Sequence, residues 1–559
     1  MAEALESEFH FSPRPNRAAE IDWRPWSPVA FEEAKSQGRP ILLSISAVWC
    51  HWCHVMDETT YSDQGVIDLV NHDYVPVRVD NDLRPDINQR YNMGGWPTTA
   101  FLTPGGDILT GATYLPPEAM RDALAKVARV YRDRKDDIEA EARQGREQAA
   151  RTGSAAAAAL DGRLVDRVLG AAEGAYDEVN GGFGSAPKFP QTETLLFLAE
   201  QGLRREEPRL LEMARHTLGR MAGGGSYDHV EGGFFRYSTT ADWSVPHFEK
   251  MLEDHAGLLQ VLSRTGQGAI LDDAVRYLTT VLRDPETGVF AGSQDADESY
   301  YALDAEGRAA LRPPFVDRRL YASWNCQLAL ALLEADNWLE RPALTGMAGR
   351  LLDSLFATLA GPDGSVLHAP GVGGQLADQV AALRAATGAW AAGLGDQWRE
   401  RAQRLVEHLD AVYGDRERGG YFDRADTDPL GRLGQRLKPL SENALAALGL
   451  LELDALLGDP RTSFRDRARL ALQAVAGLVP QLGIQAAVFA RALDRLQSRP
   501  VKVTTGTPSL IRHTLAAYPY AMIERREQEA AQVCVGATCL APELDPGRLQ
   551  ATIRAHLDA

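Results

Sequence analysis

Cysteine is scarce in this chain, with five residues among 559. So few sulfurs do not supply the disulfide framework that stabilises small secreted domains. Long apolar runs are also lacking, so we expect no membrane-spanning segment and no membrane partner. The N-terminus lacks the basic segment and apolar run of a secretory signal. These absences together predict a cytoplasmic protein.

Basic residues are also scarce relative to acidic residues. The chain has 59 Lys and Arg against 77 Asp and Glu, which gives a net charge of -18. Nucleic acids are bound through clustered Lys and Arg, so the sequence argues against a nucleic-acid partner. Its content of 45% hydrophobic and 24% charged residues is that of an ordinary globular protein. A chain of 559 residues exceeds the size of one hydrophobic core, so we expect two or more domains.

Two of the cysteines stand close together in Trp49-Cys-His-Trp-Cys-His54. Cys50 and Cys53 form a Cys-x-x-Cys pair, which is typical of a redox dithiol, while Cys-x-x-Cys-His is also the form of a c-type haem attachment site. Two thiols and two imidazoles also suit zinc. In a reducing compartment such a pair is more often catalytic or metal-binding than structural. We favour a redox dithiol that needs no other cofactor; the alternatives are zinc and a merely structural cysteine pair, and haem is the least favoured.

The surroundings of the pair predict a thioredoxin-like fold. An aliphatic run over residues 41–46 indicates a buried strand that leads directly to the pair. Helical spacing follows over residues 63–71, then a strand over 75–80, and a further strand over 98–103 before the turn at 104–107. The order is strand, Cys-x-x-Cys, helix, strand, helix and hairpin, as in thioredoxin.

This fold predicts the chemistry of the pair. A helix that begins near Cys53 places Cys50 at its N-terminus, where unpaired N–H groups and the helix dipole stabilise a thiolate. A protonated His51 adds to this effect. Cys50 is then the nucleophile and Cys53 the resolving thiol. Pro97, directly before the next strand, occupies the position of the cis-proline that faces the dithiol in this fold.

Several uncommon sequence motifs occur in order along the first part of the chain. They are Asp22-Trp-Arg-Pro-Trp26, Cys50-His-Trp-Cys-His-Val-Met56, Arg84-Pro-Asp86 and Phe101-Leu-Thr-Pro104. With them the chain resembles the YyaL and spermatogenesis-associated thioredoxin-like proteins. The resemblance implies a thioredoxin-like domain followed by a helical toroid similar to N-acylglucosamine 2-epimerases and six-hairpin glycosidases. The segment between Asp297 and Ser323 is shorter than in that family, which puts the substrate of a toroid pocket in doubt.

The remainder of the chain is predominantly helical in pattern. A charged, helix-favouring stretch over residues 117–153 precedes apolar residues at helical spacing, such as Leu210, Ala214, Leu218 and Met221. Glycine turns recur at intervals of mostly about 50 to 60 residues, which matches one helical hairpin per repeat. The turns begin at Asn180, Glu231, Thr287, Asp363 and Arg418. Six such hairpins predict a closed (α/α)6 barrel, and the rival is an open helical solenoid.

We therefore predict a multidomain protein with four segments. These are an α/β thioredoxin-like domain over residues 1–130, a helical linker over 131–159, an all-α (α/α)6 barrel over 160–498 and a small α/β segment over 499–559. In the last segment Cys534 and Cys539 resemble the paired cysteines at the C-terminus of the family. They suit either an electron relay or, the favoured interpretation, two separate thiols. Cys326 lies in apolar surroundings and is expected in the core.

The barrel loops carry acids, imidazoles and aromatics, the side chains that sugar chemistry uses. The candidates for a barrel pocket are Asp228, His229, Arg236, Tyr237, Trp243, His247, Glu249, Asp295 and Asp297. Asp and His beside glycine turns also cap helices and tie loops together, and His255 is expected to pack. A metal site from Asp228, His247 and Glu249 is a minor alternative.

The leading functional hypothesis is thiol-disulfide exchange at Cys50 and Cys53 with a protein or small-molecule partner. In this hypothesis the barrel binds a polar ligand, for which carbohydrate is the candidate. The first alternative is a sugar epimerase or glycosidase whose thioredoxin-like domain is a redox sensor or scaffold. The second is a non-catalytic binding module.

Overall fold

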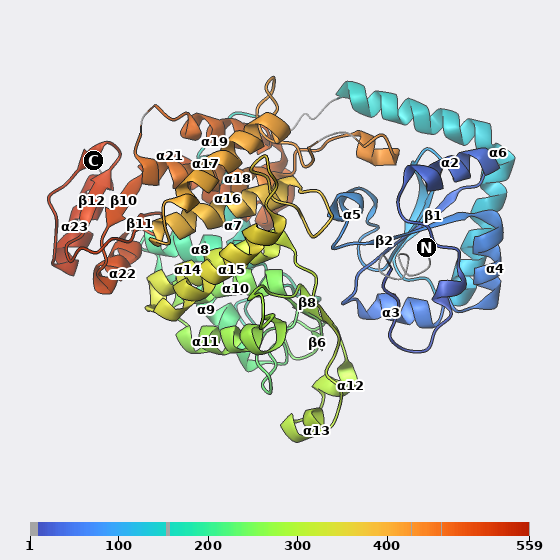
Figure 1. Ribbon diagram of the computed structural model, residues 1–559, viewed down its shortest axis with the longest axis horizontal. Helices are drawn as coiled ribbons and strands as arrows, with labels where there is room; N and C mark the ends of the chain where they lie inside the picture. Colours follow the sequence, from blue (N-terminus) through green and yellow to red (C-terminus); the bar gives the residue numbers. More distant parts are fainter. Residues whose placement is uncertain (1–8, 153–156, 426–427, 460, 558–559) are drawn as a thin grey trace. The chain divides into compact units, whose positions relative to one another are not determined.

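The computed structural model describes residues 9–152, 157–425, 428–459 and 461–557. The chain divides into two compact units, drawn in Figure 1 with the chain coloured from blue to red. Unit 1 consists of residues 1–155 and 426–436, and unit 2 of residues 156–425 and 437–559. The boundary predicted at residue 130 falls inside helix α6 (Pro117–Thr152). The membership of 426–436 in unit 1 was not foreseen, because nothing in a local pattern marks it.

Unit 1 has the thioredoxin-like sheet that the sequence predicts. Its strands are β1 (Ile41–Ser46), β2 (Val75–Asp80), β3 (Thr98–Leu102) and β4 (Ile108–Ala112). They lie in the order β2-β1-β3-β4, with β1 parallel to β2 and antiparallel to β3. All six residues of β1 are buried, because helices cover both faces of the sheet.

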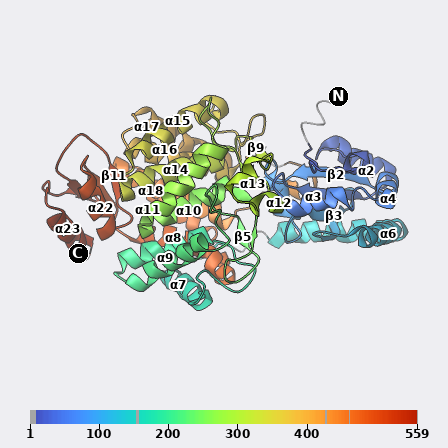
Figure 2. The ribbon, with the colours of Figure 1, turned by 90° about the horizontal axis from the view of Figure 1, so that it is seen from below.

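Alternation along β1 separates two cores. Leu43 and Ile45 pack with α2 (Pro28–Gln37) and α5 (Pro85–Tyr91) on one face. Leu42 packs on the other face with α3 (His51–Glu58), α4 (Gln64–Asp73) and α6. Helices α4 and α6 lie side by side in both views (Figures 1 and 2).

Unit 2 is a closed ring of helical hairpins. Six inner helices each contact the next, and the last contacts the first, so the described residues form an (α/α)6 barrel rather than an open solenoid. The inner helices are α8 (Thr192–Arg204), α10 (Leu252–Thr265), α14 (Ala322–Leu339), α16 (Leu376–Ala391), α18 (Leu440–Leu457) and α21 (Ala487–Gln497). Their outer partners are α9 (Pro208–Gly223), α11 (Gly268–Tyr277), α15 (Pro342–Leu359), α17 (Gln397–His408), α19 (Phe464–Gln473) and α7 (Arg163–Ala175).

The recurring glycine turns tie the hairpins together in a repeated way. A lysine ammonium bridges the aspartate that opens the turn and a glycine carbonyl within it, with Nζ–O distances of 2.6 to 2.9 Å. The three sets are Lys188 with Asp177, Lys250 with Asp228, and Lys438 with Asp415. These lysines and aspartates therefore hold the turns of the barrel.

Charged side chains of alternating sign meet inside the ring, one or two from each inner helix. We call Glu200, Arg264, Glu334, Arg384, Glu452, Arg491 and Arg495 the ionic ring. Glu200 pairs with Arg491 at 2.9 Å and with Arg264 at 3.4 Å. Arg264 reaches Glu334 at 3.0 Å, and Arg384 reaches Glu452 at 2.9 Å. Each charge is thus taken from water only beside an opposite one.

The sequence expectation that no stretch has the length of a membrane span needs one correction. Residues 464–497 have the length and mean hydropathy of such a span. In the structure this stretch is α19, α20 (Val479–Leu482) and α21, separated by short 3-10 turns. Arg491 and Asp494 in it form buried ion pairs. Its apolar residues serve the core of the barrel.

The C-terminal residues form the expected small α/β segment with a core of its own. Strands β10 (Val501–Thr504), β11 (Met522–Glu524), β12 (Gln532–Val535) and β13 (Thr538–Cys539) lie in the order β11-β10-β12-β13, with α22 (Pro508–Ala517) and α23 (Pro546–Leu557). Cys534 and Cys539 form a disulfide across β12 and β13. Our expectation of two separate thiols is therefore wrong, because the hairpin register places the two residues opposite each other. Cys326 is buried as predicted.

Candidate functional site

Cys50 stands at the N-terminus of α3, where the sequence placed it. It is the N-cap residue, and its sulfur accepts a hydrogen bond from the backbone N–H of Cys53 at 3.1 Å. A sulfur in this position is stabilised as a thiolate by the N–H groups and by the helix dipole. Cys50 and Cys53 form a disulfide, and each is 3% exposed. The structure therefore shows the oxidised form of a nearly buried dithiol.

Two loops come together beside the dithiol. The Trp96–Pro97 peptide bond is cis, as expected of the proline in this position. Thr98, which follows it, is paired with Ile45 at the end of β1, so the proline and the dithiol lie at the same edge of the sheet. Trp49 and Trp96 pack edge to face, with ring centroids 5.6 Å apart.

Acidic and aromatic side chains determine the surface through which a partner approaches Cys50 and Cys53. The indole of Trp49 donates to Asp82 at 2.7 Å, which holds the residue just before Cys50. Trp52 is 45% exposed and lies 5.1 Å from the ring of Tyr114. The ring of His51 lies 5.8 Å from that of Trp52. A partner that reaches the sulfurs thus meets an aromatic surface.

His54 belongs to the packing of the domain. It is buried, and its Nε2 lies 3.0 Å from the carbonyl oxygen of Val48. Its ring also packs edge to face with His10 at 5.9 Å. Within the described ranges no group of three or more His, Cys, Asp or Glu side chains is placed to hold a metal ion.

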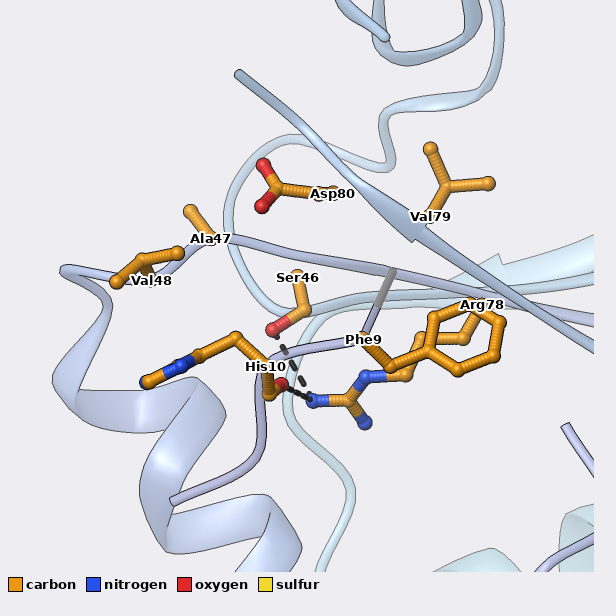
Figure 3. Close-up of a pocket in the computed structure, with 8 residues that line it drawn as sticks. All are labelled: Phe9, His10, Ser46, Ala47, Val48, Arg78, Val79 and Asp80. Atoms are coloured by element: carbon orange, nitrogen blue, oxygen red, sulfur yellow. Dashed lines mark hydrogen bonds between the residues drawn. The ribbon is translucent and has the colours of Figure 1, made fainter. Parts of the chain in front are cut away.

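A buried ion pair beneath the dithiol was not found from the sequence. Asp57 on α3 accepts two hydrogen bonds from Arg78 on β2, both at 2.9 Å, and both side chains are at most 3% exposed. Arg78 also donates to the carbonyl of His10 at 3.0 Å and to the hydroxyl of Ser46 at 3.4 Å (Figure 3). The one sequence signal is an arginine within the apolar strand Val75–Asp80.

A small cavity adjoins this pair and the loop that leads to Cys50. Its volume of about 10 Å³ is close to the space of a single water molecule. Phe9, His10 and Arg78 line it together with the stretches 46–48 and 79–80 (Figure 3). The cavity is too small for a substrate.

In the barrel, four of the predicted pocket residues lie together. His247 and Glu249 are hydrogen-bonded through Nδ1 at 2.7 Å, with Glu249 buried. The imidazole stacks on Tyr237 at 4.7 Å. The guanidinium of Arg236 lies 5.8 Å from the same tyrosine ring. A buried carboxylate that orients an imidazole is an arrangement suited to proton transfer.

Two further carboxyls join this group and were missed in the sequence as functional candidates. Glu253 and Asp254 lie in the first turn of α10. Burial and the neighbouring Glu253 raise the pKa of Asp254 to about 7, although Arg236 opposes the change. Desolvation by the surrounding protein atoms also raises the pKa of Glu253, although this residue is exposed to solvent. Their only sequence signal is an acidic pair at the start of a predicted helix.

A second imidazole-carboxylate pair was also missed. Nδ1 of His368 lies 3.0 Å from a carboxylate oxygen of Asp378, which is fully buried in the first turn of α16. Both imidazole-carboxylate pairs are thus found at or just before the N-terminal ends of inner helices.

The other candidates have structural partners within the barrel. Asp228 is bound by Lys250 and Arg308, both at 2.7 Å. Burial alone would raise its pKa, but these cations lower it to about 2. Trp243 is completely buried in the core and donates to the carbonyl of Asn180 at 3.0 Å.

The last three candidates serve loops and caps. His229 is exposed and hydrogen-bonds through Nε2 to the carbonyl of Gly224 at 3.0 Å. Asp295 is buried and accepts from the backbone N–H of Ala296 at 2.8 Å. Asp297 caps the short helix α12 (Glu298–Tyr301) through the N–H of Tyr300.

Comparison with known proteins supports the division of the chain. Residues 11–149 match the family described as Thioredox_DsbH, protein of unknown function, DUF255. Spermatogenesis-associated protein 20 of Homo sapiens is 26% identical over 712 aligned residues, which cover 95% of this chain and 89% of the human protein. The Mus musculus protein of that name is 34% identical over 50% of this chain, and the match spans 39% of the mouse protein.

Two more distant similarities concern single domains. The thiol:disulfide interchange protein DsbD of Campylobacter jejuni is 30% identical over 81 residues, 14% of each chain. The structure of cellobiose 2-epimerase from Spirochaeta thermophila matches with a TM-score of 0.47 and 18% identity, over 63% of this chain and 96% of that chain. The (α/α)6 architecture of unit 2 rests on its own helix contacts.

Proposed function

We propose that Cys50 and Cys53 of the thioredoxin-like domain carry out thiol-disulfide exchange, and the similarity of the chain to the Thioredox_DsbH family and to spermatogenesis-associated protein 20 supports this. The observation that carries the proposal is the sulfur of Cys50 at the N-cap of α3, within reach of the N–H of Cys53. The match of a short region to a thiol:disulfide interchange protein supports it.

The reaction proceeds in two steps from the reduced chain. The thiolate of Cys50 attacks one sulfur of a partner disulfide, forms a mixed disulfide and releases the other sulfur as a thiolate. The thiolate of Cys53 then attacks the sulfur of Cys50, which closes the Cys50–Cys53 disulfide and releases the second thiolate, and solvent protonates the products. The partner disulfide is reduced as the dithiol is oxidised.

The proposed partner is a protein or small-molecule disulfide, and the proposed location is the cytoplasm. The aromatic side chains of Trp52 and Tyr114 beside the dithiol favour a partner with apolar groups next to its disulfide. In a reducing compartment the dithiol would be regenerated by cellular thiols.

The test is the reduction of a model protein disulfide by the reduced chain. The reaction is monitored by the loss of the free Cys50 and Cys53 thiols. Cys50→Ser is expected to abolish the reaction, because the attacking sulfur is absent. Cys53→Ser is expected to stop at the mixed disulfide, which mass spectrometry detects as a covalent adduct on Cys50. Cys326→Ser is the control, since that thiol is buried and its pKa is raised by burial. Equal activity of all three variants would refute the proposal.

A second candidate function concerns the barrel, and the paired His247 and Glu249 favour it. We propose that unit 2 binds a polar ligand, with carbohydrate as the candidate class, and that these two residues with Asp254 supply an acid and a base. A carboxyl with a pKa of about 7 is poised for proton transfer near neutral pH.

The barrel proposal is tested by titrating the full chain with a panel of mono- and disaccharides in a calorimeter. His247→Ala should weaken the binding of a sugar that the wild type binds, by at least tenfold. His229→Ala, an exposed histidine of a neighbouring loop, should leave it unchanged. Absence of binding across the panel would contradict the proposal.

A further inference from the structure

A segment that follows the fourth hairpin of the barrel in sequence is built into the thioredoxin-like unit. We call residues 428–436 the strap. Leu433 in the strap is completely buried and belongs to the same hydrophobic core as Trp26, Phe31 and Tyr91. Leu430 packs against this core as well. One face of the thioredoxin-like unit is therefore completed by a segment from another part of the chain.

Backbone atoms of the strap are held by the last turn of α5. Arg90 donates to the carbonyl of Arg432 at 3.1 Å and to that of Gln435 at 2.6 Å. The hydroxyl of Tyr91 accepts from the N–H of Arg432 at 2.8 Å and donates to the carbonyl of Gly106 at 2.8 Å. Because these bonds go to backbone atoms, they define the position of the strap independently of most of its side chains.

Helix α5 also connects two loops whose side chains contact Trp49, the residue before Cys50. The loop before it carries Asp82, which holds the indole of Trp49 next to Cys50. The loop after it leads through Asn92, which accepts from the N–H groups of Gly94 and Gly95, to Trp96 and Pro97. A displacement of α5 therefore moves two groups that hold Trp49 next to Cys50.

The residues of unit 2 on either side of the strap in sequence are bonded to each other. Asp423 and Leu437 are joined by two hydrogen bonds of 2.8 Å, one between backbone atoms and one to the Asp423 carboxylate. The carbonyl of Asp423 accepts from the N–H of Leu376, where α16 begins. Helix α18 begins three residues after Leu437. The two residues of unit 2 that flank this segment, Asp423 and Leu437, are thus held near the N-terminal ends of two inner helices.

We propose that the strap couples the dithiol to the barrel: docking of residues 428–436 on α5 sets the redox equilibrium of Cys50 and Cys53, and their oxidation state in turn changes how firmly the strap is held. The proposal rests on the proposed thiol-disulfide function and names a regulation of that site. Coupling of this kind is reciprocal, because two equilibria that share one element must influence each other equally. Asp82, Arg90 and Tyr91 act as positioning residues in it.

Two glycines of the strap allow a matched test in the full-length chain. A Cβ at Gly431 would lie 2.3 Å from the hydroxyl of Tyr91, and the residue has a φ of +54°, so Gly431→Ala should undock the strap without removing a core side chain. A Cβ at Gly434 would have its nearest neighbour at 3.7 Å, an ordinary contact, so Gly434→Ala is the control. Trypsin cleavage after Arg432 and Arg436 reports docking. Equilibration with dithiothreitol, followed by alkylation and mass spectrometry, reports the redox equilibrium.

Gly431→Ala is expected to be cut in the strap at least fivefold faster than Gly434→Ala, and its equilibrium constant with dithiothreitol should differ by at least threefold. In the wild type, reduction should change the rate of strap cleavage by at least threefold. If the strap of Gly431→Ala is cleaved faster but the equilibrium constant with dithiothreitol is unchanged, the coupling is wrong. If the strap of Gly431→Ala is cleaved at the wild-type rate, the docking is wrong. If no variant forms the Cys50–Cys53 disulfide, the proposed function fails as well, while the cleavage rates still report on docking.

Discussion

At the scale of single residues, His255 shows how a histidine serves a structural role. Its Nε2 accepts a hydrogen bond from the N–H of Phe234 at 2.9 Å, and its Nδ1 lies 2.7 Å from the carbonyl of Met251. In other repeats Asn325 and Asn443 accept the same kind of N–H, from Phe290 and Tyr421. His255 therefore replaces an amide side chain in a repeated contact.

Replacing His255 tests this role. His255→Leu leaves the buried N–H of Phe234 without an acceptor and should lower the free energy of unfolding by about 1–3 kcal/mol. His255→Gln keeps an acceptor, as Gln379 does for Val366, and should cost less than about 1 kcal/mol. Urea unfolding of unit 2 at pH 7 measures both. Equal losses would contradict the assignment.

The same residue predicts a pH dependence. Burial lowers the pKa of His255 from 6.5 to about 4, with the hydrogen bond to Met251 opposing the change. Between pH 6.5 and 4 the imidazole of His255 is protonated in the unfolded state but neutral in the folded state. The contribution of the neutral, buried His255 to the free energy of unfolding is therefore lost as the pH falls from 6.5 to 4. His255→Gln should lack this loss in unfolding experiments across that range.

At the scale of elements, α3 is fastened to the sheet by charge as well as by apolar contacts. Met56 packs in the core below the helix, and Asp57 reaches Arg78 on β2. The pair is almost inaccessible to water, so removing one partner leaves an uncompensated buried charge. The position of the helix that carries the dithiol depends on both partners.

Arg78→Met is therefore expected to destabilise unit 1 by about 3–5 kcal/mol. The double variant Asp57→Leu with Arg78→Met should recover much of this loss, since no charge is then left unpaired. Arg17→Met, which breaks an exposed pair with Glu20, should change the free energy of unfolding little. Urea unfolding, monitored by tryptophan fluorescence, checks the predicted order of stability of the three variants. A single variant as stable as the control would refute the argument.

At the scale of the whole molecule, the ionic ring joins all six inner helices of unit 2. Burial alone would raise the pKa of Glu452, but Arg384 and Arg495 outweigh it and hold the pKa below its ordinary value of 4.5. Glu200 has a lowered pKa for the same reason, through Arg491 and Arg264. Their contribution to stability is present above pH 4.5 and is lost as the pH falls through the lowered pKa values.

Glu452→Gln should lower the free energy of unfolding of the barrel by about 3 kcal/mol or more at pH 7, because the buried Arg384 and the partly buried Arg495 lose their partner. The variant should also show a smaller loss of stability below pH 4.5 than the wild type. Glu400→Gln, in an exposed pair with Arg404, is the matched control and should change little. Urea midpoints from pH 3 to 7 give the comparison.

Local patterns in the sequence were sufficient for the elements and for the dithiol. The strand before Cys50, the capped helix after it and the glycine turns depend on the conformations of neighbouring residues, which a short stretch of sequence specifies. The number of hairpins followed from the spacing of the turns, and closure of the ring follows once six hairpins bury their apolar faces against each other.

Only the tertiary structure decided which charged residues are structural and which are placed for chemistry. Asp228 and Trp243 have the residue types of a ligand pocket, yet one is neutralised by two cations and the other lies in the core. Glu253 and Asp254 became candidates only when the surroundings that raise their pKa values were known. The strap and the ionic ring join residues far apart in the chain. Desolvation and ion pairing depend on such distant neighbours, and no short stretch of sequence contains them.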